Sequence, residues 1–179
     1  ADASGILIEG NEFRNLVDKD PFHTDPIQIY GGARITIRRN YFHDNSVAAA
    51  IGGWDGNDHN VIEDNVIVGS ESQGVAIAMS SDNGSIIRHN TLVQGKCAYN
   101  WKCGIVLIDH KVGDDASTGT IVRDNILSEI TDTDATGTTI DHNLFTGAQA
   151  ASYVGPTTTY AGYKLAPASP GKGGASDGT

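Results

Sequence analysis

Short apolar segments recur along the chain, and each is followed by an asparagine at a fixed distance. In Ile37–Phe42, an aliphatic residue is followed by two arginines, Asn40, a tyrosine and an apolar residue. The general form is aliphatic-x-x-Asn-x-apolar. It occurs six times, with the asparagines at Asn11, Asn40, Asn65, Asn90, Asn125 and Asn143, which are 29, 25, 25, 35 and 18 residues apart. A period near 25 residues with variable insertions is typical of a repeat protein.

Each copy begins with a short strand-like alternation, as in Ile35–Ile37, and the asparagine follows at a bend. Asparagine tolerates the left-handed conformation, and its amide can donate to and accept from an identical group in the next repeat. A repeat of this length holds three strands of about 4–6 residues and three turns. The sequence therefore predicts an all-β fold, a parallel β-helix of about six coils with an asparagine ladder. The coils are expected over residues 1–146, and residues 147–179 are expected to form a C-terminal tail or cap packed on the solenoid.

The balance of charges limits the choice of partners. The chain has 12 Lys and Arg against 22 Asp and Glu, which gives a formal net charge of −10. Nucleic-acid binding needs clustered Lys and Arg, so nucleic acid is not expected as a partner. No run of 18 apolar residues occurs, so no membrane span is expected either.

Two further features bear on where the protein works and what it adjoins. Cys97 and Cys103 lie in one short insertion, and we expect them to form a disulfide, which indicates an exported protein. Residues Gly5–Ile8 read as a strand at the very start of the chain, and a solenoid normally caps its first coil. We therefore expect earlier coils, or a partner chain, beside this end.

Candidate functional residues lie where the repeat is interrupted, because insertions on one side of a repeat array usually build its binding face. Alternation along Ile27–Tyr30 places the two isoleucines inward and Gln28 and Tyr30 outward. Aligning the coils predicts two outward rows, one of Gln28, Ala49, Ala76 and Val106 and one of Tyr30, Ile51, Ala78 and Ile108. The polar and aromatic candidates around this face are His23, Asp25, Gln28, Tyr30, Arg34, Trp54, Asp55, His59, Asp109, His110 and Lys111.

These repeats resemble the right-handed parallel β-helix units of the pectate-lyase-like superfamily. Leu165–Gly171 is similar to the closing segment of many secreted bacterial members, and His23–Gln28 resembles a His-x-Asp-x-x-Gln signature of carbohydrate-active β-helix proteins. Asp20–His23 also loosely resembles the Asp-Pro-His-acid motif of mannuronan C5-epimerases, although Phe22 interrupts it and Thr24 replaces the acid. The resemblance implies right-handed coils, a secreted protein and a polysaccharide partner.

The activity implied is that of a lyase or C5-epimerase acting on an acidic, uronate-containing polysaccharide. Both reactions remove the C5 proton beside a carboxylate, so they need a base and a positive charge. His23 and His110 are the candidate bases. Asp25 completes the candidate catalytic set, and Tyr30 is placed to return a proton. The carboxylate can be neutralised by Lys111, by Arg34, or by calcium, for which Asp18 and Asp20 are weak candidate ligands.

Two other functions remain open. One is a non-catalytic carbohydrate-binding or structural β-helix, which is favoured by the small, uncharged side chains expected on the outer strand. The other is a glycoside hydrolase with two carboxylates, Asp25 paired with Asp55 or Asp109. Simpler structural roles compete at each position: Asp25 can cap a strand, Asp109–Lys111 can be a solvated turn, and Trp54 can pack its own insertion rather than stack on a sugar.

Overall fold

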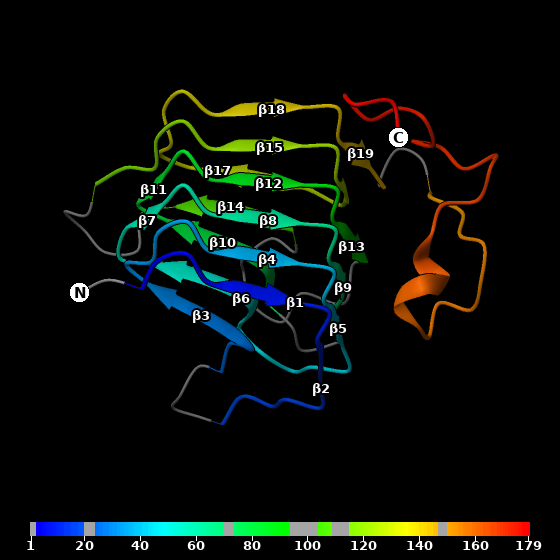
Figure 1. The fold of residues 1–179 in the computed structure, drawn as a ribbon, viewed down its shortest axis with the longest axis horizontal. Helices are drawn as coiled ribbons and strands as arrows, with labels where there is room; N and C mark the ends of the chain where they lie inside the picture. The colour runs from blue at the N-terminus through cyan, green and yellow to red at the C-terminus, as the bar shows by residue number, and fades with distance from the viewer. Residues whose placement is uncertain (1–2, 20–23, 70–73, 94–103, 109–114, 147–149) are drawn as a thin grey trace.

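The computed structural model describes residues 3–19, 24–69, 74–93, 104–108, 115–146 and 150–179, and its core is a solenoid of three parallel sheets (Figure 1). The first sheet contains β1 (Leu7–Glu9), β4 (Thr36–Arg38), β8 (Val61–Glu63), β12 (Ile86–Arg88), β15 (Ile121–Arg123) and β18 (Thr139–Asp141). The second contains β2 (Glu12–Arg14), β5 (Tyr41–His43), β9 (Val66–Val68), β13 (Thr91–Val93), β16 (Ile126–Leu127) and β19 (Leu144–Phe145). The third contains β3 (Ile27–Tyr30), β6 (Ala49–Trp54), β10 (Val75–Ser80), β14 (Ile105–Ile108) and β17 (Ile130–Asp132). β7 (Asn57–Asp58) and β11 (Asp82–Asn83) pair at one corner.

Aliphatic side chains at the same position of successive coils stack in the interior. On the first sheet, Ile37 pairs with Ile62, and Ile62 is followed in register by Ile87. All three are fully buried. Burial of such a side chain contributes about 1.5–3 kcal/mol, so each added coil extends one continuous core.

The predicted asparagine ladder is confirmed. The Oδ1 of Asn65 accepts hydrogen bonds from the backbone N–H and the Nδ2 of Asn40, both at 3.0 Å. The Nδ2 of Asn65 donates to the Ile37 carbonyl at 2.9 Å and to the Oδ1 of Asn90 at 3.0 Å. Each buried amide is therefore satisfied by the coils on both sides.

The prediction of about six coils is corrected to about four. Ladder asparagines that are at most 1% exposed occur in four motif copies, at Asn40, Asn65, Asn90 and Asn125. The copies at the two ends form edge strands with exposed apolar side chains, Leu7 at 53% and Ile140 at 43%. The motif covers strands of the first two sheets only. Counting its copies therefore overestimates the number of coils that have a strand in all three sheets and a neighbouring coil on each side.

The predicted outward rows of the third sheet are partly wrong. Ile27 and Ile29 are buried and Gln28 and Tyr30 are exposed, as the alternation predicts. However, Gln28 pairs with Gly52 rather than Ala49. The further members of this row are Ala78 and Val106, whereas Ile51 belongs to the core with Ile27 and Ile77, and Ala76 also packs in that core.

A bulge accounts for the inward position of Ala76. The backbone N–H groups of Ala76 and Ile77 both donate to the Gly104 carbonyl, at 3.1 Å each. Two residues of β10 thus oppose one residue of its neighbour, which reverses the inward and outward alternation at that point. As a result, Ala49, Trp54, Val75, Ala78 and Val106 form a second buried apolar cluster, separate from the main core.

The C-terminal segment, residues 150–179, lies against the corner between the first two sheets, on the right of Figure 1. It contains the short 3-10 helix η1 (Tyr160–Tyr163). The Tyr160 hydroxyl donates to the Asp64 carbonyl at 2.6 Å, and the Tyr163 ring lies 6.1 Å from the Tyr41 ring. No helix in the described part of the chain has the length and hydrophobicity that a membrane span requires.

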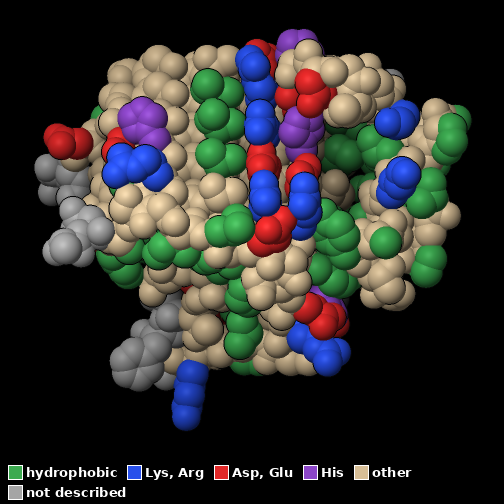
Figure 2. Space-filling model, viewed as in Figure 1, with side chains coloured by type: hydrophobic (Ala, Val, Ile, Leu, Met, Phe, Trp, Pro, Cys, Tyr) green, Lys and Arg blue, Asp and Glu red, His purple; other side chains and the backbone are tan. Residues whose placement is uncertain are grey.

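Charged side chains of both signs run along the outer face of the first sheet as a column (Figure 2). Arg38 binds Glu9 at 2.9 Å, Arg88 binds Glu63 at 2.7 Å, and Arg123 binds Asp141 at 2.8 Å. Exposed pairs of this kind contribute little individually, typically about 0–1 kcal/mol. These arginine side chains are therefore paired with carboxylates of the same face.

Candidate functional site

Several of the predicted site residues lie outside the described residues, namely Asp20, His23, Asp109, His110 and Lys111. The same holds for Cys97 and Cys103. The remaining candidates fall into separate groups on the solenoid. One group lies on the first coil of the third sheet, and a second lies at the corner that leads into the first sheet.

The first group, which we call the first-coil cluster, consists of Asp25, Gln28, Tyr30 and Trp54. The Asp25 Oδ1 accepts from the Ala49 backbone N–H at 2.9 Å. Its Oδ2 accepts from the Gln28 Nε2 at 3.1 Å and from the Trp54 Nε1 at 3.4 Å. The carboxylate thus both caps a strand and joins two predicted ligand-binding side chains.

Gly52 makes this arrangement possible. A Cβ at this position would lie 2.7 Å from the Trp54 Nε1 and 2.9 Å from the Asp25 Oδ2. This role of Gly52 was not predicted from the sequence. Its signal was present in the pattern, because a glycine inside a strand often marks a close approach of another group.

The two aromatic side chains of the cluster differ in exposure. Trp54 is 7% exposed and packs in the second apolar cluster, whereas Tyr30, its neighbour in register on β3, is 57% exposed. A sugar ring stacks on an accessible aromatic face. In this structure that surface belongs to Tyr30, and Trp54 supports the Asp25 carboxylate from beneath.

The second group, the corner cluster, contains Arg34, Asp58, His59 and Asn83. The His59 Nδ1 lies 2.6 Å from the Asp58 Oδ1, which also accepts from the Asn83 Nδ2 at 2.8 Å. The hydrogen bond to His59 is the main reason that the pKa of Asp58 is lowered. The Arg34 backbone N–H donates to the backbone carbonyl of Asp58 at 2.8 Å, and the positive charge of Arg34 also lowers the pKa of the Asp58 carboxyl.

Asp25 and Asp55 lie at different points along β6. The Asp25 carboxylate accepts from the N–H of Ala49, the first residue of β6, and lies beside the position of Gly52, whereas Asp55 follows the last residue of this strand. The other pair predicted for a glycoside hydrolase includes Asp109, which lies outside the described residues.

Calcium is poorly supported by the described side chains. The Asp18 Oδ1 accepts from the Thr24 backbone N–H at 2.5 Å, which is a loop-capping contact. Among the described residues, no group of three or more His, Cys, Asp or Glu side chains is placed to hold a metal ion. Calcium typically takes six to eight oxygen ligands, and the described side chains form no cluster of that kind.

A groove lies between the C-terminal segment and the corner of the first two sheets, and the sequence analysis missed it. Its volume is about 500 Å³. The solenoid wall includes His89, Asp124 and His142, and the opposite wall includes Lys164 and Lys172. The three solenoid residues each precede a ladder asparagine, so aligning the motif copies would have shown that they form one column.

Searches among curated proteins and among solved structures each returned no match. A family profile described as the right handed beta helix region matches residues 1–160. This match agrees with the parallel sheets and the buried asparagine ladder. The chain belongs to the right-handed beta-helix family.

Proposed function

We propose that this protein is an exported β-helix that acts on an acidic, uronate-containing polysaccharide as a lyase or C5-epimerase. The observation that carries the proposal is the first-coil cluster, in which Asp25, Gln28 and Trp54 are joined by hydrogen bonds next to the exposed Tyr30. Carbohydrate sites combine accessible aromatic surface with a few fixed polar groups. The exposed apolar side chain of Leu7 on the edge strand β1 supports pairing with a partner chain.

The reaction begins with removal of the proton at C5 by a base. In the lyase outcome, the electron pair forms the C4–C5 double bond and the oxygen at C4 leaves, taking a proton from an acid. In the epimerase outcome, a proton is returned to the other face of C5. His23 and His110 are the proposed bases, Lys111 and Arg34 the proposed positive charges, and Tyr30 the proposed proton donor.

Asp25 has a defined part in this proposal. Its carboxylate already accepts hydrogen bonds from Gln28 and Trp54, so it holds the exposed Gln28 side chain in place beside the sugar. Charged acceptors form the stronger class of hydrogen bonds. Removing the charge loosens the cluster without removing a side chain.

A non-catalytic carbohydrate-binding protein is the second candidate, and one observation favours it. The row that follows Gln28 in register consists of Gly52, Ala78, Val106 and Thr131, and Ala78 and Val106 are buried in the second apolar cluster. None of these described residues carries the positive charge that a lyase needs beside a uronate carboxylate. Binding without chemistry is therefore the natural rival.

The two candidates are separated by incubating the protein with a panel of polyuronates. The proposal predicts retention of the protein by at least one polyuronate, together with an unsaturated product that absorbs in the ultraviolet or exchange of the C5 proton. Tyr30→Ala is expected to weaken retention about tenfold. Retention without either chemical change would establish the binding protein, and no retention at all would refute both candidates.

A further inference from the structure

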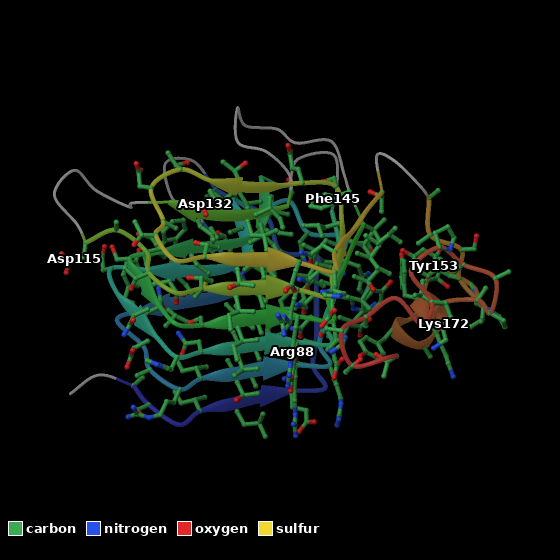
Figure 3. All side chains as sticks on the ribbon, turned by 90° about the horizontal axis from the view of Figure 1, so that it is seen from above. Arg88, Asp115, Asp132, Phe145, Tyr153 and Lys172 are labelled. Atoms are coloured by element: carbon green, nitrogen blue, oxygen red, sulfur yellow. The ribbon has the colours of Figure 1, made fainter. Side chains whose placement is uncertain are left out.

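The groove between the C-terminal segment and the solenoid has the dimensions of a ligand site. Its volume of about 500 Å³ lies within the range of about 300–1,000 Å³ that small-molecule sites occupy. The C-terminal wall is held in place by Tyr160, which donates to the Asp64 carbonyl, and by Ser176. Figure 3 shows Tyr153 and Lys172 on this segment, set apart from the stacked coils.

The acidic side chains at the groove are already engaged. The two carboxylate oxygens of Asp124 accept from the backbone N–H and the hydroxyl of Ser176, at 2.7 and 2.6 Å. Asp177 pairs with His89 at 3.2 Å and accepts from the Thr179 N–H at 3.1 Å. Asp64, which also lines the groove, interacts with the charge of Arg38.

The lysine side chains at the groove, in contrast to these acidic side chains, are not engaged by other described side chains. Lys164 and Lys172 are both exposed and line the groove. Within the described residues, neither ammonium group takes part in an ion pair or a side-chain hydrogen bond. In a chain of net charge −10, these two lysines place positive charge at a groove whose lining also holds the carboxylates of Asp64 and Asp124.

We propose that this groove binds a small carboxylated sugar, such as a uronate mono- or disaccharide. Lys164 and Lys172 pair with the carboxylate. The two oxygens of Asp124 each keep a second lone pair, so Asp124 accepts from the hydroxyl groups, together with His142 on the same wall. A sugar acid fits walls of mixed sign because its single charge is accompanied by many neutral hydroxyls. A phosphate dianion has no such hydroxyls, and Asp64 and Asp124 would repel it.

This site is separate from the first-coil cluster, although it shares the ligand class of the proposed function. It would serve as an additional subsite for sugar units at the corner between the first two sheets, whereas the first-coil cluster lies on the third sheet. The two sites are tested independently because Tyr30→Ala affects one and substitution of the lysines affects the other.

The test is a calorimetric titration of the protein with digalacturonate, with a neutral disaccharide and inorganic phosphate as comparison ligands. The double variant Lys164→Ala/Lys172→Ala is expected to bind digalacturonate at least tenfold more weakly. The matched control is Lys19→Ala, which removes one exposed lysine far along the chain and should bind as the wild type does. Circular dichroism checks that all variants keep the β-helix.

Three results would overturn the proposal. Unchanged affinity in the double lysine variant would place binding elsewhere. Loss of binding in Tyr30→Ala with full binding in the lysine variant would assign the sugar to the first-coil cluster alone, leaving the proposed function intact. Phosphate binding as tightly as digalacturonate would show a general anion site instead of a sugar-acid site.

Discussion

The asparagine ladder gives the most quantitative prediction, and Asn65→Ala is the substitution that tests it. Asn65 lies in the middle of the ladder and is fully buried. The alanine leaves the Asn40 backbone N–H without its acceptor. It also removes three further hydrogen bonds, those to the Asn40 Nδ2, the Ile37 carbonyl and the Asn90 Oδ1.

These losses can be converted into a free energy of unfolding. An unpaired buried N–H costs about 1–3 kcal/mol, and each of the other hydrogen bonds contributes about 0.5–1.5 kcal/mol. Allowing for non-additivity, we expect Asn65→Ala to lower the free energy of unfolding by about 3–5 kcal/mol. The typical single substitution costs about 1 kcal/mol, so the effect should be clearly separable.

The assay is urea denaturation followed by circular dichroism, with Asn11→Ala as the matched control. Asn11 occupies the same motif position at the exposed end of the ladder, and its side chain only donates, to the Glu9 carbonyl and the Asn40 Oδ1. Its substitution leaves no buried group unpaired, so a cost below about 1 kcal/mol is expected. If the two variants lost equal stability, the ladder would not be what holds the coils together.

Three further predictions use the same denaturation assay. Gly52→Ala places a Cβ 2.7 Å from the Trp54 Nε1 and forces the ring to move. We expect the free energy of unfolding to fall by about 1–3 kcal/mol, and a variant as stable as the wild type would refute this. Burial raises the pKa of the Asp82 carboxyl in the folded protein, so ionisation of this group opposes folding. The stabilisation by the protonated carboxyl is fully present below the pKa of Asp82 in the unfolded chain, and it is lost as the pH rises through the pKa in the folded protein. The free energy of unfolding of Asp82→Asn, relative to that of the wild type, should therefore be higher at pH 7 than at pH 3. A difference that does not change with pH would contradict this prediction. Tyr160→Phe removes the hydrogen bond to the Asp64 carbonyl. We expect the free energy of unfolding to fall by about 0.5–1.5 kcal/mol and the C-terminal segment to be cleaved faster by proteases. An unchanged rate of proteolysis would show that this contact does not hold the segment in place.

The sequence predicted the scaffold because the ladder depends on a requirement that is visible in each repeat. A buried amide must find partners one coil above and below, so asparagine recurs at a fixed distance after each apolar strand. The register of the third sheet could not be predicted in the same way. A bulge at Ala76 and Ile77 reverses the alternation, and the apolar pattern there allows either register.

The functional residues were predicted unevenly for a similar reason. Asp25 and Gln28 are close in sequence, so their contact follows from a short local segment. Trp54 joins them from the next coil only because Gly52 leaves room, a relation that needs the three-dimensional register. The groove depends on the docking of residues 150–179 onto the solenoid, which no local pattern specifies.

Exchange of the C5 proton tests the proposed function most directly. The protein is incubated with polyuronate oligosaccharides in deuterated water, and C5 deuterium and the unsaturated product are followed by NMR. The proposal predicts one of these two changes, with a rate at least tenfold lower for Asp25→Asn, which keeps the shape of the side chain and removes its charge. Binding of the oligosaccharide with neither deuterium nor unsaturation would contradict the proposed chemistry.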